Sequence, residues 1–438
     1  MQYVQQVLFC IMAAGAIYWF SKKVAEIRRN IFLGKAQDLS DNPGKRWNNV
    51  LLLALGQKKM FQNVPVAIMH FIIYAGFIII NIEVLEIVLD GILGTHRLFL
   101  PYLGIVYGWL INIFEWLAAG VILVCIIFLS RRNWLKLKRF ISKDLNGWPK
   151  TDANLILITE IVLMSLFLTM NAADQILQDR SVAHYEQTGN FFLSAQLIPI
   201  FEGLSDGTLM AIERTAWWIH IAGIFAFLNY LPYSKHLHIA LAFPNAYYAK
   251  LDAPGKMKNM PEVQNEVLYA MQPEQAPSNA APPASFGAKD VFDLSWKNLL
   301  DAYSCTECGR CTSECPANQT GKLLSPRKIM MATRDRLEDV GRNINVNKSF
   351  VSDNKSLLHD YISVEELRAC TTCNACVEAC PVSISPLDII VELRRSLIME
   401  ESNAPQEWNG TFSNIENNFA PWKFSPDDRD KWATEMAS

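Results

Sequence analysis

Two copies of one cysteine pattern lie in the last third of this 438-residue chain and restrict its fold more than any other feature. Each copy reads CxxCxxCxxxCP. The copies comprise Cys305, Cys308, Cys311 and Cys315, and then Cys370, Cys373, Cys376 and Cys380. In such paired runs three closely spaced cysteines hold one [4Fe–4S] cluster, and the fourth cysteine ligates the cluster of the other run. The sequence therefore predicts two clusters, with the ligand sets Cys305, Cys308, Cys311, Cys380 and Cys370, Cys373, Cys376, Cys315.

A pair of structural zinc sites is the main alternative, because zinc is also bound by CxxC pairs. Zinc takes four ligands per site in two such pairs and does not need a triple repeat with a distant fourth cysteine, so clusters are favoured. A disulfide framework is favoured less still. The two other cysteines, Cys10 and Cys125, fall within long apolar stretches, where we expect them to pack as small hydrophobic residues.

Apolar residues are concentrated in the first half of the chain. Hydrophobic residues make up 51% of the chain and charged residues only 19%, an average that combines a membrane half with a soluble half. Five segments are long and apolar enough to cross a bilayer: residues 3–20, 64–89, 102–129, 155–173 and 209–230. The first has no basic n-region and no small-residue cleavage site, so we interpret it as a retained span and not as a signal peptide.

Basic residues indicate how these spans are oriented. They gather after the first span and after the third. The loop after the second span has only two basic residues, His96 and Arg97, and the loop after the fourth contains more acidic than basic residues. By the positive-inside rule the N-terminus lies outside and the C-terminus lies in the cytoplasm. We expect a multi-pass protein of a bacterial or archaeal cytoplasmic (inner) membrane, with the cysteine runs in a reducing compartment. The net charge of −3 says little about partners, and nucleic acid is not expected among them.

Composition divides the chain into four parts. Residues 1–250 form the membrane domain, and residues 251–288, rich in Pro, Ala, Gln and Asn, form a predicted linker. Residues 289–401 contain both cysteine runs, and residues 402–438 are a tail that we expect to dock a partner. The insert between Cys315 and Cys370 and the segment after Cys380 have helical patterns. The predicted fold class is therefore all-α, with a five-helix transmembrane domain and a cytoplasmic α-helical dicluster domain.

Two histidines lie inside predicted spans, His70 in the second and His220 in the fifth, where ionisable groups are costly and mark functional sites. Neutral imidazoles that face each other across a helix bundle form a bis-histidine heme b site; the alternative is a hydrogen bond between helices. His238 follows His220 by eighteen residues, so on one continuous helix both point the same way, about 27 Å apart. A second heme is then expected near the cytoplasmic edge. On such a helix His236 points to the side opposite His220, and Pro232 introduces a kink. The alternative is that His236 and His238 form a pair at the membrane interface without a metal.

The fifth span and its exit resemble a known membrane cytochrome. The segment reads WWIHIAGIFAFLNYLPYSKHLHIALAFP. It is similar to the last helix of the cytochrome b subunit of respiratory nitrate reductases, which is also found as the membrane subunit of heterodisulfide reductases. The spacing of His220 and His238 matches that family, whose second span has two histidines ten residues apart; here His70 matches one, and Met60 stands in place of the other. The resemblance implies one heme b on His70 and His220, and a second that involves His238 and Met60.

The cysteine domain resembles the small iron-sulfur subunit of heterodisulfide reductase and the helical dicluster ferredoxin domains of related respiratory proteins. The likeness covers both cysteine runs and the insert between them. Further on, the chain reads NIENNFAPWKFSPDDRDKWA, which resembles the stretch that joins this domain to a cysteine-rich CCG module in fused homologues. Because no CCG module follows in this sequence, the resemblance implies a separate CCG-type iron-sulfur subunit as partner.

Together these parts favour an electron relay between a soluble partner and a membrane quinone. Fused relatives that pass electrons from electron-transfer flavoprotein to menaquinone are most similar in layout, which implies the electron-transfer subunit of a quinone oxidoreductase. Flow from menaquinol to a cytoplasmic disulfide or sulfur substrate is the first alternative, and a non-catalytic membrane redox sensor or scaffold is the second. The sequence has no Gly-rich nucleotide-binding loop in a suitable context, so flavin and nicotinamide chemistry belongs to partners.

Several charged and aromatic residues near the spans receive no firm role. The carboxylates among them are candidates for proton transfer in quinone chemistry, although pairing or a place at the interface explains most of them. They are Glu83, Glu86, Glu115 and Glu160. Trp217 and Trp218, next to Glu213 and Arg214, are predicted first as anchors at the membrane interface.

Overall fold

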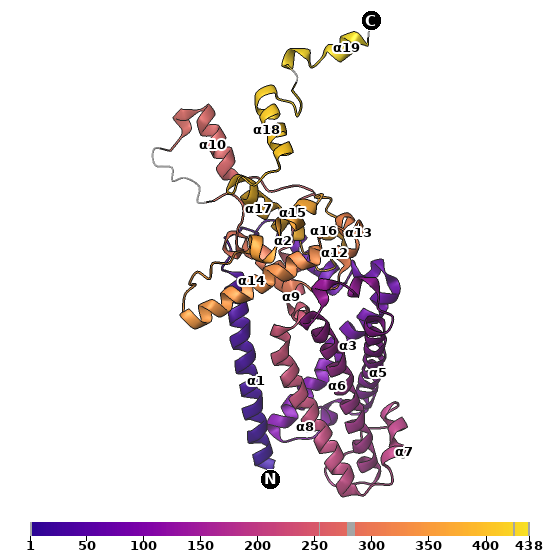
Figure 1. Ribbon diagram of the computed structural model, residues 1–438. Helices are drawn as coiled ribbons and strands as arrows, with labels where there is room; N and C mark the ends of the chain where they lie inside the picture. The colour runs from indigo at the N-terminus through magenta and orange to yellow at the C-terminus, as the bar shows by residue number, and fades with distance from the viewer. Residues whose placement is uncertain (1, 254, 278–284, 424, 437–438) are drawn as a thin grey trace.

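The computed structural model describes residues 2–253, 255–277, 285–423 and 425–436, whose regular structure is helical (Figure 1). Two isolated bridges, Lys35 with Ser295 and Leu358 with Ile362, are the β-structure of these residues. The all-α class is thus confirmed for the described part of the chain. A bundle of long helices carries the cysteine domain on one end, which we call the near end; the opposite end is the far end.

Five long helices form the bundle. They are α1 (Gln2–Ile31), α3 (Val64–Leu93), α5 (Ile105–Asn133), α6 (Trp148–Asp179) and α8 (Asp206–Tyr230). Among the described residues, four helices are long and apolar enough to cross a membrane: α1, α3, α5 and α6. The count of five spans is not confirmed, because α8 forms as a continuous helix where it was predicted but contains Glu213 and Arg214 and is not one of the four.

Local sequence explains where these helices begin and end. The Asn63 side chain accepts a hydrogen bond from a backbone N–H in the first turn of α3, and Pro65 occupies that turn, where its missing N–H costs nothing. Gly94 ends α3 with a φ of 73°, a left-handed conformation that glycine adopts without strain. The Ser205 side chain caps α8 in the same way as Asn63 caps α3.

The bundle core consists of apolar side chains from all five long helices. Phe9 of α1 is fully buried, and its ring centroid lies 5.8 Å from that of Trp217 on α8. Two glycines allow neighbouring helices to approach closely. A Cβ atom at Gly91 of α3 would lie 2.6 Å from the Phe9 ring, and one at Gly223 of α8 would lie 2.8 Å from Leu163 of α6.

The chain does not continue as one helix beyond α8. Two 3-10 turns, Leu231–Tyr233 and Lys235–Leu237, follow Tyr230 before α9 spans His238–Tyr247. Pro232 lacks the backbone N–H that a continuing helix would need. The expected continuous helix from His220 to His238 is therefore wrong. His236 and His238 do not point to opposite sides either, since their ring centroids are 5.6 Å apart.

The cysteine domain consists of short helices around two longer ones. The longer helices, α14 (Pro326–Asn347) and α17 (Pro386–Met399), form where helical patterns predicted them. The short helices are α11 (Trp296–Ser304), α12 (Arg310–Ser313), α13 (Pro316–Gln319), α15 (Val364–Ala369) and α16 (Ala375–Ala379). Their common core includes Ile27 and Ile31 of α1 and Leu237 of the turn after α8. The domain is thus packed directly onto the near end of the bundle.

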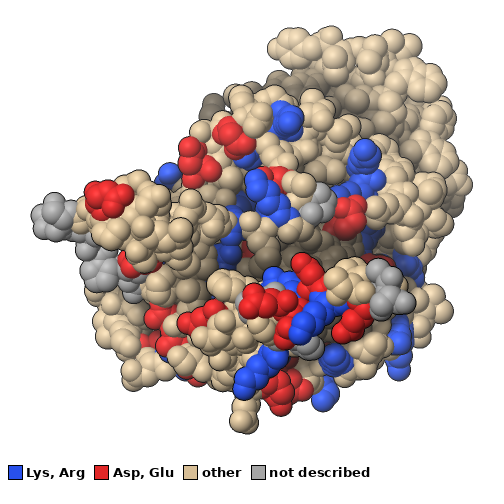
Figure 2. Space-filling view, turned by 90° about the horizontal axis from the view of Figure 1, so that it is seen from above, with Lys and Arg blue, Asp and Glu red and all other residues tan. Residues whose placement is uncertain are grey.

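The remaining helices lie in connections and in the tail. The loops of the bundle contain α2 (Pro43–Asn49), α4 (Leu100–Leu103) and α7 (Ile198–Phe201). The predicted linker contains a helix, α10 (Pro261–Met271), and the tail contains α18 (Gln406–Asn418) and α19 (Lys431–Glu435). α10, α18 and α19 project away from the rest of the chain (Figure 1). Seen from above, from the end of the molecule that carries the cysteine domain, Lys and Arg side chains are interspersed with Asp and Glu (Figure 2).

Candidate iron-sulfur and heme sites

The first cysteine run closes around a cavity that faces the bundle, which we call the bundle-side cavity. Four cysteines line it: Cys305, Cys308, Cys311 and Cys380. After α11 the chain is extended, and Glu307 and Gly309 then adopt left-handed conformations with φ values of 53° and 75°. These two reversals curl the loop, and α12 follows at once. The predicted ligand set of one cluster is therefore brought together around one space.

The second run repeats this geometry around the surface cavity. The cysteines that line it are Cys315, Cys370, Cys373 and Cys376. Thr372 and Asn374 are left-handed, with φ values of 56° and 63°, at the same two offsets from the first cysteine as Glu307 and Gly309. A short helix, α16, follows as α12 does in the first run. The fourth cysteine of each run thus lies in the cavity of the other run, as crossed ligation requires.

The chemistry of both cavities fits an iron-sulfur cluster. Burial raises the pKa of the Cys380 thiol to about 12, and the nearby Cys308 adds to the shift. Burial likewise raises the pKa of Cys376 to about 12, with a further contribution from Cys370. Thiolates that converge in this way need a cation between them, and metal binding releases their protons. The crossed ligand assignment remains a prediction, which this arrangement favours.

Backbone N–H groups also point at the sulfur atoms. Ile384 N lies 3.3 Å from Cys380 Sγ, and Thr372 N lies 3.4 Å from Cys370 Sγ. Hydrogen bonds to cluster sulfurs are one of the means by which proteins set cluster potentials. These contacts are a second feature of the chain that fits [4Fe–4S] binding.

The two cavities differ in their access to solvent. Each cavity has two buried cysteines, Cys305 and Cys380 in one and Cys315 and Cys376 in the other. Cys308, Cys311 and Cys370 are half-buried, and only Cys373, in the surface cavity, is exposed. The surface cavity is therefore the one that a soluble partner can approach.

Side chains of the bundle-side cavity bond directly to loops at the near end of the bundle. Arg310 Nη1, between two cysteines of the first run, donates to Lys59 O at 3.0 Å. Arg327, which is 1% exposed and lines the cavity, donates to Asp144 Oδ2 at 2.8 Å and to Arg139 O at 3.0 Å. The first cysteine loop is thus held on two separate loops of the membrane domain.

A buried group of charges ties the same cysteine loop to the turn after α8. Glu307, 5% exposed, forms ion pairs with both Lys235 and Arg334. Burial favours a higher pKa for the Glu307 carboxyl, but Arg334 and Lys235 outweigh it and the pKa is lowered. Asp152 of α6 accepts hydrogen bonds from Ser234 Oγ at 2.7 Å and from Lys235 N at 3.2 Å, and so fixes the turn from the other side.

Three histidines gather next to the bundle-side cavity. His70 of α3 lies within electrostatic reach of His238 and of Arg310, and His236 lies within reach of both other histidines. Burial lowers the pKa of His236 to about 3, and it also lowers the pKa of His238. Both rings are therefore neutral, the form in which imidazole binds a metal.

His220 and Met60 take different places. His220 lies in the bundle core, with Nδ1 2.9 Å from Leu163 O and its ring centroid 6.4 Å from that of Phe167. Met60 begins a 3-10 turn (Met60–Gln62) in the loop before α3, where Met60 N donates to Gln57 O at 2.8 Å. The structure thus brings His70 toward His236 and His238, whereas the resemblance to cytochrome b subunits pairs His70 with His220.

Three of these histidines are held in the manner of heme ligands. Nδ1 of His70 lies 3.0 Å from Gln57 Oε1, Nδ1 of His220 bonds to Leu163 O, and Nδ1 of His238 lies 3.0 Å from Lys235 O. An oxygen that only accepts keeps the proton on Nδ1, so Nε2 is left with its lone pair. Metal-ligating histidines are typically fixed in this tautomer by such a second contact. The residues therefore fit the axial positions of heme b.

Sequence reasoning missed the residues that connect the two domains, above all Glu307, Arg310 and Lys235. Charged residues between the cysteines of the first run were the available signal for two of them. Two smaller expectations need correction. Trp217 is 8% exposed and so lies inside the bundle, whereas the other predicted anchor, Trp218, is half-buried. Cys125 is buried as expected, but Cys10 is exposed on α1.

Four long apolar helices and two cavities lined by four cysteines each indicate a membrane protein with sites for iron-sulfur clusters. The 4Fe-4S dicluster domain family matches residues 304–384. A probable iron-sulfur-binding oxidoreductase of Bacillus subtilis, FadF, is 27% identical over 98% of this chain and 60% of its own length. The EtfAB:quinone oxidoreductase of Syntrophomonas wolfei is 25% identical over 98% of this chain and 59% of its own length.

A third relative matches the cysteine domain. It is one subunit of the ferredoxin/F(420)H(2)-dependent CoB-CoM heterodisulfide reductase of Methanosarcina acetivorans, 35% identical over 27% of this chain and 60% of its own length. The chain spans about 60% of the length of the relatives that match it throughout. No solved structure matches it. The chain is thus similar to iron-sulfur oxidoreductases, among them the EtfAB:quinone oxidoreductase, and its cysteine domain is similar to this heterodisulfide reductase subunit.

Proposed function

We propose that this chain is the membrane electron-transfer subunit of a quinone-linked oxidoreductase, and that it relays electrons between a cytoplasmic iron-sulfur partner and menaquinone. The observation that carries the proposal is the order of the sites. The surface cavity has an exposed cysteine, Cys373. Side chains around the bundle-side cavity bond to loops of the bundle, and the histidine group lies within electrostatic reach of Arg310 in the first cysteine run. Bound there, two [4Fe–4S] clusters and heme b would supply one-electron carriers.

The chain itself holds these positions in register. Arg310 reaches from the first cysteine run to the loop that precedes α3, and Lys235 joins Glu307 to the turn that carries His236 and His238. A buried, bonded connection of this kind keeps neighbouring redox sites at a constant separation. It also places cations beside the thiolates of the first run, where they offset negative charge.

Two lines of support indicate the heme ligands, and they differ in the partner of His70. The resemblance pairs His70 with His220, and His238 with Met60. The structure supports a near-end heme that uses His70 with His238, because these two rings interact and each has an anchored Nδ1. We therefore propose His70 as an axial ligand in either pairing, His220 and His238 as its competing partners, and Met60 as a ligand only of a second heme.

The partners are proposed from the relatives. The Syntrophomonas relative bears the name EtfAB:quinone oxidoreductase, which supports electron-transfer flavoprotein as the donor. A CCG-type iron-sulfur subunit is proposed as the intermediary on the resemblance of the tail segment NIENNFAPWKFSPDDRDKWA. The basic loops at the near end support a cytoplasmic position for the cysteine domain, beneath a bacterial or archaeal inner membrane, and we propose that α8 crosses this membrane as a fifth span. The match to the Methanosarcina heterodisulfide reductase favours, as the second candidate, flow from menaquinol to a cytoplasmic disulfide.

The first experiment is a dithionite-minus-oxidised optical spectrum of the purified chain, with pyridine hemochrome, iron and sulfide content. We expect a b-type heme together with about eight non-heme irons. His70→Ala should abolish the heme spectrum. One of the two variants His220→Ala and His238→Ala should abolish it as well, and that variant identifies the partner of His70. Iron without heme would overturn the cytochrome proposal and favour a membrane redox sensor or scaffold.

A further inference from the structure

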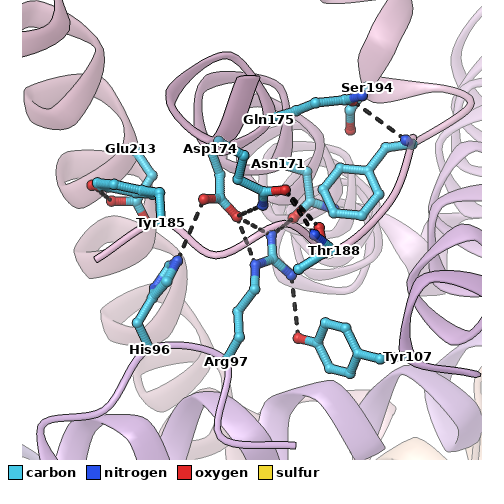
Figure 3. A network of polar contacts seen from close by, with 12 residues as sticks. His96, Arg97, Tyr107, Asn171, Asp174, Gln175, Tyr185, Thr188, Ser194 and Glu213 are labelled. Carbon is cyan, nitrogen blue, oxygen red and sulfur yellow. Dashed lines mark hydrogen bonds and ion pairs between the residues drawn. The ribbon is translucent and has the colours of Figure 1, made fainter. Parts of the chain in front are cut away.

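The far end of the bundle holds a buried network of charged and polar side chains (Figure 3). Its members come from α3, α5, α6 and α8 and from the loops that follow α3 and α6. Six of them are carboxyl groups that are at most 7% exposed: Glu83, Glu86, Asp90, Glu115, Asp174 and Glu213. Two arginines, Arg97 and Arg214, face them. Carboxyl groups thus outnumber arginines by a wide margin in a place where an unpaired charge is costly.

Arginines and hydroxyl groups satisfy three of the carboxylates. Asp174 accepts from Arg97 Nε at 2.6 Å, and Glu213 is bonded by Arg214. Glu86 Oε2 accepts from Tyr107 OH at 2.7 Å, while its other oxygen accepts from a backbone N–H at 2.7 Å. These three can therefore be ionised without a bare charge.

Backbone donors satisfy two more. Both Asp90 oxygens accept backbone N–H bonds from the loop after α3, at 2.9 and 3.2 Å. Glu115 Oε2 accepts two backbone N–H bonds, at 2.9 and 3.2 Å, and Oε1 accepts from Asn171 Nδ2 at 3.1 Å and from the Ser194 hydroxyl. Donors of this number stabilise a carboxylate even without a formal cation.

Glu83 is the exception. It is 4% exposed, and among the described residues its Oε2 atom is buried without a hydrogen-bond partner. The charged groups that act on it are Arg97 from the loop, Glu86 and Asp90 on its own helix, and Glu115 on α5. Arg97 is already engaged by Asp174 and lies over the Tyr107 ring. An ionised Glu83 would lie among three carboxylates with a bare oxygen, which buried charges do not tolerate.

A chain of polar contacts leads from the neighbourhood of Glu83 to the far surface. One turn along α3, Glu86 accepts from Tyr107, whose hydroxyl in turn lies 3.2 Å from Arg97 Nη1. Arg97 bonds Asp174, and Asp174 Oδ1 lies 3.4 Å from His96 Nε2. The His96 side chain is 24% exposed. Figure 3 shows this succession from His96 to Tyr107. A carboxylate and a histidine in contact, as Asp174 and His96 are, commonly form part of a proton relay inside a membrane. The guanidinium of Arg97 keeps its protons, so it holds Asp174 and Tyr107 in place and does not carry a proton itself.

We propose that Glu83 is a proton-exchange residue, a neutral carboxylic acid at neutral pH that gives up its proton inside the bundle and regains one through the far-end network. The inference rests on the proposed function, in which a menaquinone gains two electrons from the iron-sulfur side and two protons. For each proton, the O–H bond of Glu83 breaks and a quinone oxygen binds the proton. Glu83 is then reprotonated from water at the far surface. Quinol oxidation runs the same transfers backwards.

The charge state of Glu83 is tested on the full chain in lipid nanodiscs by infrared spectroscopy, since a carboxylic acid has a C=O band that a carboxylate lacks. Glu83→Gln should remove one such band, and Glu115→Gln, the matched carboxylate control, should not. The melting temperature of Glu83→Gln should equal that of the parent, because an amide replaces a neutral acid at nearly equal volume. An unchanged acid band in Glu83→Gln overturns the proposal, whatever the fate of the control.

The exchange path is tested by the rate at which the Glu83 band shifts in D₂O. Tyr107→Phe removes the hydroxyl between Arg97 and Glu86 and should slow this exchange about tenfold or more. Glu83→Gln should retain dithionite-reducible clusters and lose quinone reduction by a factor of about 10²–10⁴. Unchanged quinone reduction in Glu83→Gln overturns the relay and leaves the proposed function intact. A parent protein that has the Glu83 band but reduces no quinone overturns the proposed function, and the relay with it.

Discussion

Cys315 and Cys380 are the two residues whose roles depend most on crossed ligation. If each belongs to the cavity in which the structure places it, Cys380→Ala removes the cluster of the first run and leaves the second. Iron content should fall from about eight to about four atoms per chain. Alkylation followed by mass spectrometry should then label Cys305, Cys308 and Cys311. Cys315→Ala should give the reverse pattern, and labelling of Cys370 and Cys376 in Cys380→Ala would contradict the crossed assignment.

Glu307 is the residue whose charge most directly joins the two domains. Glu307→Gln leaves the half-buried Arg334 without its anion and Lys235 with only Asp152, 3.7 Å away, which should destabilise the cysteine domain by about 1–3 kcal/mol. Removing a negative charge next to the first run should also raise the reduction potential of the nearby cluster. Thermal unfolding and a redox titration measure the two effects. Glu314→Gln, an exposed carboxylate in the same run, is the control and should change neither.

At the scale of single residues, sequence predicted best where the chemistry is local. The grouping of the cysteines was predictable from their spacing: the members of each predicted set line one cavity, and the crossed ligation stays a prediction. The contacts of Arg310 and Glu307 were not predictable, since their partners, Lys59 and Lys235, lie far away in sequence. Glu83 was noticed only as one carboxylate among several. What distinguishes it is a missing partner in a network drawn from four helices, and no sequence pattern encodes that.

Single helices show how far packing depends on one position. Gly91 of α3 lies against the Phe9 ring of α1, and a Cβ at Gly91 would come within 2.6 Å of it. Gly91→Ala should therefore lower stability by about 1–3 kcal/mol through overpacking. The double variant Gly91→Ala with Phe9→Leu should regain part of this loss, which thermal unfolding in detergent measures.

The matched control is another glycine in a long helix. A Cβ at Gly15 of α1 meets nothing within 4 Å. Gly15→Ala should leave stability unchanged or raise it by up to about 1 kcal/mol, the gain in helix propensity. If Gly15→Ala and Gly91→Ala lower the stability equally, the loss in Gly91→Ala does not arise from the contact between α1 and α3.

The elements themselves were predictable where hydrophobic length or periodicity dominates. α1, α3, α5 and α6 form where apolar length predicted spans, and α14 and α17 form where amphipathic patterns predicted helices. The structure of the segment after α8 was not predictable, because the helix ends before Pro232 and the chain continues as two 3-10 turns. That break brings His236 and His238 toward His70, an arrangement that a straight helix does not allow.

The whole molecule contains two principal apolar cores that depend on the clusters to different degrees. The core of the cysteine domain includes Cys305, Cys315 and Cys380 themselves. The main core of the bundle contains no residue of either cysteine run. Because metal binding contributes directly to the folding of small metal domains, the cysteine domain should lose order without iron while the bundle keeps it.

Oxidation followed by iron chelation tests this difference. Limited proteolysis of the iron-free protein should cut rapidly within residues 289–401, and the fragments of α3, α5 and α6 should stay intact. Only part of the domain should open toward solvent at first, since Ile27, Ile31 and Leu237 anchor its core to the bundle. Rebuilding the clusters with iron and sulfide under reducing conditions should restore protection. If the bundle is cleaved at the same rate as the cysteine domain, the two cores unfold as one unit, and contacts such as Lys235 with Glu307 transmit the loss of iron to the membrane helices.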